Sequence, residues 1–128
     1  MRKLISSGSY LEPEIGFSRA VRVGDIIAVS GTAPIGESGE TIGEDDVYAQ
    51  TMRCLNIASS ALAQAGGRME DVIRSRIMLT DVTTWREAAR AHGEVFGAFR
   101  PACTFVEVSR FIDPGWLVEI EIDAIVHP

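Results

Sequence analysis

The segment LVEIEIDAIV, residues 117–126, alternates apolar and acidic side chains at nearly every position. This period of two is typical of a β-strand, in which successive side chains point to opposite faces of a sheet. One face of the strand would carry Val118, Ile120, Ile122, Ala124 and Val126, and the other Leu117, Glu119, Glu121, Asp123 and Ile125. The fold must therefore cover one face of this strand and leave the acidic face in a polar or partly exposed environment.

Working outward, the rest of the chain supplies further strands and two helices. Strands are predicted at residues 18–23, 26–30, 69–80 and 103–110, with a short one near Leu4, and helices at about 46–65 and 85–96. Gly24-Asp25 predicts a two-residue hairpin turn, Asp45 or Asp46 caps the first helix, and Thr84-Trp85-Arg86-Glu87 has the pattern of a capping box. We expect loops at residues 11–14, 34–45 and 111–116. The order ββαβαββ predicts an α+β fold with a mixed sheet and both helices on one face.

Length and charge limit the class of protein. The chain has 128 residues, which predicts a single domain over 1–128, and a formal net charge of −6. Because nucleic-acid binding depends on Lys and Arg neutralising phosphates, a nucleic-acid partner is not expected. No apolar run reaches the length of a membrane span, and no signal-peptide segment follows Met1-Arg2-Lys3, so we expect a cytoplasmic protein without a membrane partner.

The cysteines and histidines do not form a metal-binding pattern. Cys54 and Cys103 lie far apart and belong to no CxxC or Cys/His cluster, and His92 and His127 form no paired motif. We expect two separate thiols, with Cys54 in the core, and neither a metal nor a cofactor.

The helices can cover only one face of the sheet. If residues 103–110 alternate, Cys103 and Phe105 share a face, and we expect them beside the carboxylates of residues 117–126. A face of that composition suits a subunit interface containing a polar pocket better than open water or a dry core. The sequence therefore predicts a homo-oligomer.

Four separated motifs resemble one family. They are Ile15-Gly16-Phe17-Ser18-Arg19-Ala20-Val21, Val29-Ser30-Gly31-Thr32-Ala33-Pro34, Arg100-Pro101-Ala102 with Val106-Glu107-Val108, and Ile120-Glu121-Ile122-Asp123-Ala124. Together they resemble the Rid (YjgF/L-PSP) family over nearly the whole chain. The resemblance implies a chorismate-mutase-like α+β fold, a homotrimer and ligand pockets in the clefts between subunits. Active deaminases of the family hydrolyse enamines and imines such as 2-aminoacrylate and 2-iminopropionate to a 2-keto acid and ammonia without a cofactor. Some relatives are described as endoribonucleases or translation inhibitors.

The resemblance also suggests which residues form the site. Glu121 matches the family's acid on the last strand, and Gly31 matches the glycine at its Ser-Gly strand end. Cys103 stands where deaminases carry an arginine that pairs with the substrate carboxylate, Phe17 stands where they commonly carry Tyr, and Phe105 stands at a position that is often Cys. A thiol cannot replace the fork of donors of a guanidinium. The resemblance therefore implies weak or no activity on 2-aminoacrylate.

Each candidate has a functional and a structural interpretation. Glu121 is the candidate general acid or base that orients water; alternatively it forms an interface ion pair with Arg100 or Arg110 of a neighbour. Glu119 and Glu107 are weaker candidates. Cys103 is either a nucleophile or a small apolar filler of the cleft.

Three further residues remain candidates for the ligand pocket. His92 is either a pocket residue or a satisfied, partly buried histidine. Gly31 either permits a tight strand exit or offers its backbone to a ligand. Arg100, in the loop before the strand, is the better candidate to replace the missing arginine, since Arg110 should point away from Cys103.

Three functions are consistent with these residues. The leading hypothesis is a Rid-like homotrimer that binds a small metabolite at the inter-subunit cleft and hydrolyses an imine or enamine. The alternative is a non-catalytic ligand-binding or regulatory trimer. The third, an endoribonuclease or translation inhibitor, depends on family descriptions alone and disagrees with the acidic charge.

Overall fold

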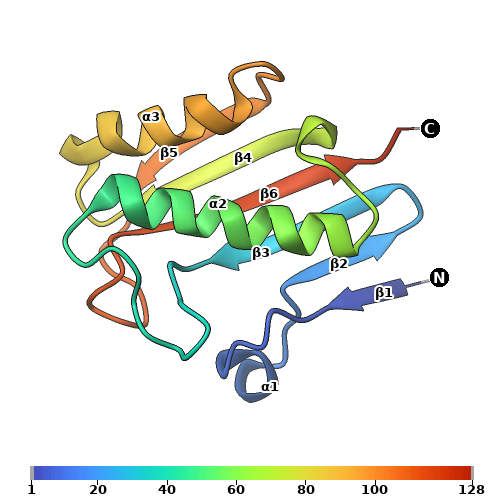
Figure 1. Cartoon of the computed structure of the whole chain (residues 1–128), viewed down its shortest axis with the longest axis horizontal. Coiled ribbons are helices and arrows are strands. Elements are labelled where there is room, and N and C mark those ends of the chain that lie inside the picture. The colour runs from blue at the N-terminus through green and yellow to red at the C-terminus, as the bar shows by residue number, and fades with distance from the viewer. Residues whose placement is uncertain (1, 128) are drawn as a thin grey trace.

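Six strands form one mixed sheet in the order β1-β2-β3-β6-β4-β5 (Figure 1). The strands are β1 (Arg2–Ile5), β2 (Ala20–Val23), β3 (Ile26–Thr32), β4 (Val72–Leu79), β5 (Ala102–Glu107) and β6 (Val118–Ile125). The β4–β5 pair is parallel and the other neighbouring pairs are antiparallel. This computed structural model describes residues 2–127. The predicted α+β fold with a mixed sheet is confirmed.

The strand β6 lies between β3 and β4, near the centre of the sheet. Its apolar face is fully buried: Val118, Ile120, Ile122 and Ala124 expose at most 1% of their surface. Glu119, Glu121 and Asp123 point to the other side and stay partly exposed. The alternation of residues 117–126 therefore predicted both faces of the central strand correctly.

Two long helices cover the apolar face, α2 (Val47–Gln64) and α3 (Trp85–Phe96) (Figure 1). The α2 helix starts at Asp46, whose side chain accepts a hydrogen bond from the amide of Ala49, 3.0 Å away. Its buried stripe includes Cys54, Leu55, Ala58 and Leu62, so the core position predicted for Cys54 is confirmed. Since both helices lie on one side, the other face of the sheet has no helical cover.

The ends of several elements differ from the prediction. The capping box at Thr84 is absent; Asp81 instead accepts hydrogen bonds at the start of a short 3₁₀ helix, η2 (Val82–Thr84), which precedes α3. Another 3₁₀ helix, η1 (Met69–Asp71), occupies the start of the strand expected at 69–80, because the Asp71 carboxylate accepts a hydrogen bond from the Arg68 amide.

Two further corrections concern the loop expected at residues 11–14 and the strand expected at residues 103–110. Residues 11–14, expected as a loop, belong to the short helix α1 (Leu11–Ile15), which ends at Gly16 with a left-handed φ of 88°. The strand expected over 103–110 ends at Glu107. The two-residue hairpin turn at Gly24-Asp25 is confirmed by the register, which pairs Val23 with Ile26.

Candidate functional site

Two of the three carboxylates on the helix-free face of β6 form ion pairs. The register places Glu121 opposite Arg76 of β4, and the two side chains form an ion pair. Asp123 lies 4.0 Å from the Arg74 guanidinium. Glu119 is different, because its partner on β4 is Met78. The strand pairing therefore leaves Glu119 without a cation from β4.

The Glu119 side chain instead lines a cavity of about 330 Å³ at the end of β3. We call it the Glu119 cavity; six of its lining residues are Phe17, Arg19, Gly31, Ile112, Trp116 and Glu119. Burial raises the pKa of Glu119, and the charge of Arg19 opposes that rise in part. A raised pKa brings a carboxyl group closer to the pH range in which it can both accept and donate a proton, as general acid–base chemistry requires.

Gly31 is placed where a side chain would meet this carboxyl. A Cβ at this position would lie 2.9 Å from Oε1 of Glu119. Its φ is not in the left-handed region, so a side chain at residue 31 would meet no backbone strain but would displace the end of the Glu119 side chain. Phe17 and Gly31, both predicted as site residues, are thus brought together with Glu119.

Arg19 is the charged residue of this cavity that the sequence analysis did not single out. The side chain is buried, and its Nη1 donates to the carbonyl of Gly31 at 2.6 Å and to Oγ1 of Thr32 at 3.1 Å. Its guanidinium carbon lies 5.2 Å from the centre of the Phe17 ring, within the range of a cation–π contact. Burial lowers the pKa of Arg19, although a guanidinium stays charged at neutral pH.

Glu121, the acid selected from the sequence, does not line the Glu119 cavity. Its ion-pair partner within the chain is Arg76, and a contact with Arg100 or Arg110 of a neighbouring subunit stays a prediction. Arg100 is exposed in the loop between α3 and β5, with φ 55°. Within residues 2–127, the only arginine that lines the Glu119 cavity is therefore Arg19.

Cys103 and Phe105 do not lie beside the carboxylates of β6, so that expectation was wrong. The parallel pairing aligns Cys103 with Ser75 and Phe105 with Ile77, and both of these β4 residues are buried on the helix side. Phe105 packs against the core there. Cys103 is exposed on β5, at the edge of the sheet. The residues of β5 that share the helix-free face are Ala102, Thr104 and Val106.

His92 also lies on the helix side of the sheet, in α3. Its Nε2 is 2.7 Å from Oγ of Ser75, and its ring centre is 4.7 Å from that of Phe96. Burial lowers the pKa of His92. This geometry matches the satisfied, partly buried histidine and separates His92 from the Glu119 cavity of its own subunit.

Neither a membrane helix nor a metal cluster is found in residues 2–127. None of the helices there is both long and apolar enough to cross a membrane. No group of three or more His, Cys, Asp or Glu side chains in that range could hold a metal ion.

Comparison with known proteins agrees with this fold. Residues 8–126 match the model of the family described as endoribonuclease L-PSP. The chain belongs to this family, which includes the YjgF and Rid proteins. The match covers Phe17, Gly31, Arg19 and Glu119, so the Glu119 cavity is built from the family's part of the chain.

Several relatives of this L-PSP family member are similar over most of their length. An uncharacterized protein of Streptomyces coelicolor is 39% identical over 121 residues, covering 94% of this chain and 89% of its own. A RutC family protein of Pyrococcus horikoshii is 30% identical over 127 residues, covering 99% and 98%. The crystal structure of Rv2704 from Mycobacterium tuberculosis, a member of the YjgF/YER057c/UK114 family, is 45% identical with a TM-score of 0.90 and covers 98% of this chain and all of its own.

Proposed function

We propose that this L-PSP family protein is a homotrimer that binds a small metabolite in a cleft between subunits and hydrolyses its imine or enamine form. The observation that carries the proposal is the Glu119 cavity. It combines a partly buried carboxyl group of raised pKa with the glycine and the aromatic residue that the family resemblance assigns to the site.

The helix-free face supports the assembly. Exposed apolar side chains from four strands lie on it beside the ion pairs of β4 and β6: Val23, Ile26, Val106 and Ile125. Exposed apolar groups on a sheet face favour burial against another copy of the same chain. The strand β5 forms an edge of the sheet, so a neighbouring subunit can meet Cys103, Phe105 and the preceding Arg100 there.

Glu119 is the group that we propose for proton transfer. As a carboxylate it accepts a proton from the water that adds to the C=N carbon; as a carboxylic acid it returns the proton to the departing nitrogen. The products are a carbonyl compound and ammonia, and the balance needs no oxidant, reductant or cofactor. An enamine must first take up a proton at carbon to become the imine.

The substrate differs from that of the arginine-bearing deaminases. Cys103 offers one weak donor where those deaminases hold the substrate carboxylate with a guanidinium. We therefore propose that imines without a carboxylate at that position are turned over better than 2-iminopropionate. A protein of the same fold, TdcF of Escherichia coli, has been crystallised with bound serine; it is 23% identical with a TM-score of 0.79 and covers 87% of this chain and 88% of its own. We also propose that the protein is located in the cytoplasm.

The test is hydrolysis of a panel of imines, including 2-iminopropionate, by the wild type, Glu119→Gln and Glu121→Gln. The wild type should turn over at least one imine, and Glu119→Gln should lose about 10²-fold or more in kcat. Glu121→Gln should lose less, because its partner is Arg76. Sedimentation of each variant checks that the trimer is intact.

Two outcomes would overturn this assignment. Equal activity of Glu119→Gln and wild type would remove Glu119 from the chemistry. If no imine is turned over by the wild type or by Cys103→Arg, while a small ligand binds saturably to intact trimers, the protein is a non-catalytic binding module.

A further inference from the structure

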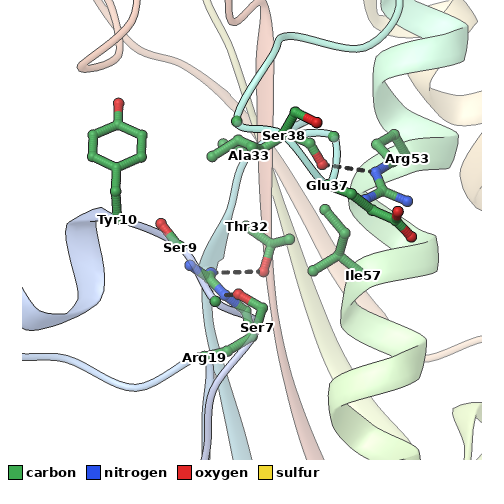
Figure 2. A pocket seen from close by; sticks show the side chains of 14 residues that line it. Ser7, Ser9, Tyr10, Arg19, Thr32, Ala33, Glu37, Ser38, Arg53 and Ile57 are labelled. Atoms are coloured by element: carbon green, nitrogen blue, oxygen red, sulfur yellow. Dashed lines mark hydrogen bonds between the residues drawn. The ribbon is translucent and has the colours of Figure 1, made fainter.

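A second cavity, of about 340 Å³, adjoins the Glu119 cavity and shares the lining residues Ser9, Arg19, Ala33 and Ile35 with it. Figure 2 shows its walls: the segment that carries Ser7 and Ser9, the end of β3 at Thr32, and the α2 residues Arg53 and Ile57. We call it the two-arginine cavity, because Arg19 and Arg53 both line it. Its volume is in the range of small-molecule pockets.

Arg19 brings a buried positive charge to this cavity. Its Nε donates to Oγ of Ser7 at 3.2 Å and its Nη1 to Gly31 and Thr32, while its Nη2 makes no hydrogen bond to residues 2–127. No carboxylate of those residues lies within ion-pair distance of the guanidinium. The charges of Glu12 and Glu119 act on Arg19 only from beyond ion-pair distance, so an anion in the cavity would give the buried guanidinium a direct partner.

Arg53 approaches the same space from α2. Its Nε donates to the carbonyl of Ile35 at 2.8 Å, which fixes the guanidinium beside the loop after β3. Its two terminal nitrogens make no hydrogen bond to residues 2–127. The acid in the lining is Glu37, which is exposed and forms no ion pair with either arginine. The lining therefore has an excess of positive charge although the chain is acidic overall.

The remaining walls offer both donors and an apolar surface. The Ser9 hydroxyl accepts a hydrogen bond from the Leu11 amide, which leaves its own proton available, and Ser38 adds a second hydroxyl. Ile57 and Ala33 supply apolar surface to the same lining (Figure 2). Guanidinium forks with hydroxyl donors are the groups that proteins use to hold carboxylate and phosphate oxygens.

We propose that the two-arginine cavity is a binding site for a small organic oxyanion, a carboxylate or a phosphate ester with a short apolar part. The anion is held between Arg19 and Arg53, and its apolar part lies against Ile57. Of the two cavities, only the two-arginine cavity is lined by Arg53 and Ile57, so this site is distinct from the one proposed for imine hydrolysis.

The experiment is calorimetric titration of the wild-type protein with succinate and, separately, with inorganic phosphate in low-salt buffer. At least one probe should bind saturably at millimolar concentration or better. Binding of succinate alone identifies an organic acid site, binding of phosphate alone identifies a phosphate ester site, and binding of both identifies recognition of charge. Absence of saturable binding of either probe would overturn the proposal.

Substitutions locate the binding. Arg53→Gln should weaken it about 10- to 100-fold, since it removes charge-assisted hydrogen bonds, and Arg53→Lys should weaken it less. Arg86→Gln is the matched control, because Arg86 is an exposed α3 residue outside both cavities. Ile57→Phe, which keeps both arginines but fills the cavity, provides a second test if Arg53→Gln does not fold. An unchanged affinity in both Arg53→Gln and Ile57→Phe, or an equal loss in Arg86→Gln, would refute the site.

The two proposals fail separately. Arg53→Gln should keep the imine hydrolysis of the wild type, and Glu119→Gln should keep the binding of the anion. A wild type that binds an anion but hydrolyses no imine would overturn only the proposed function, and one that hydrolyses an imine but binds neither anion would overturn only the two-arginine site.

Discussion

Gln50 joins the loop after β3 to the segment that leads into β6, and we expect its replacement by leucine to destabilise the protein strongly. The side chain is fully buried in α2. Its Nε2 donates to the carbonyls of Gly115 at 2.9 Å and Gly43 at 3.2 Å, and its Oε1 accepts from the amide of Leu117 at 2.8 Å. Leucine has nearly the same volume, so Gln50→Leu removes hydrogen bonds while the packing changes little.

The expected loss follows from the groups left without partners. A buried donor or acceptor that loses its partner costs about 1–3 kcal/mol. The two shorter bonds, to Gly115 and Leu117, therefore suggest a loss of about 3 kcal/mol in the free energy of unfolding. With an unfolding entropy of about 2.1 cal/mol/K per residue, 128 residues give about 270 cal/mol/K. The Tm of Gln50→Leu should then fall by about 11 °C.

Thermal and guanidinium unfolding followed by circular dichroism would measure this loss. All proteins are compared at one concentration, because the midpoint of an oligomer depends on it. Gln64→Leu is the matched control: Gln64 lies in the same helix, is exposed, and donates only to Oγ of Ser60 at 3.3 Å. It should change the free energy by no more than about 0.5 kcal/mol. A loss in Gln50→Leu below about 1 kcal/mol, or equal to that of Gln64→Leu, would refute the reasoning.

Three further predictions concern titratable groups. Burial raises the pKa of Glu119, so the ionised carboxylate makes the folded state less stable. Glu119→Gln should therefore raise the Tm at pH 7 relative to the wild type, and this gain should shrink as the pH falls to about 4. An equal gain at both pH values would contradict it. Because burial lowers the pKa of His92, the wild type should lose stability as the pH falls from about 7 to 5, and His92→Gln should reduce that dependence; identical pH profiles would argue against it. One thiol should react with Ellman's reagent in the native protein and two in denaturant, since Cys103 is exposed and Cys54 is buried with a raised pKa; rapid reaction of both native thiols would show that α2 opens.

The faces of β6 could be predicted from the sequence, but the face of β5 could not. Alternation shows that Cys103 and Phe105 lie on one side and Thr104 and Val106 on the other, yet both sets mix apolar and polar residues. The side is decided by the parallel register with β4, which places Phe105 beside Ile77 in the core. That register joins two strands that α3 separates along the chain, and no local pattern in residues 102–107 contains it.

The choice among the three acids of β6 also depended on a neighbouring strand. Glu119, Glu121 and Asp123 are equivalent in the alternating pattern. They differ because β4 places arginines opposite two of them and Met78 opposite Glu119. Arg19 was missed for a related reason: it is buried beside the buried Ala20, which breaks the alternation that strand prediction assumes. Its only signal in the sequence was a charged side chain two positions after Phe17.

The central place of β6 has a consequence for synthesis of the chain. The ribosome makes β3 long before β6, and β3 can complete its pairing only when residues 118–125 have emerged. Until then β3 and β4 each keep an unpaired edge, and such edges promote association between nascent chains. Pairings that are distant in sequence also slow folding. Translation that stops before Val118 should therefore give an aggregating product, whereas the sheet can close once residues 118–125 have left the ribosome.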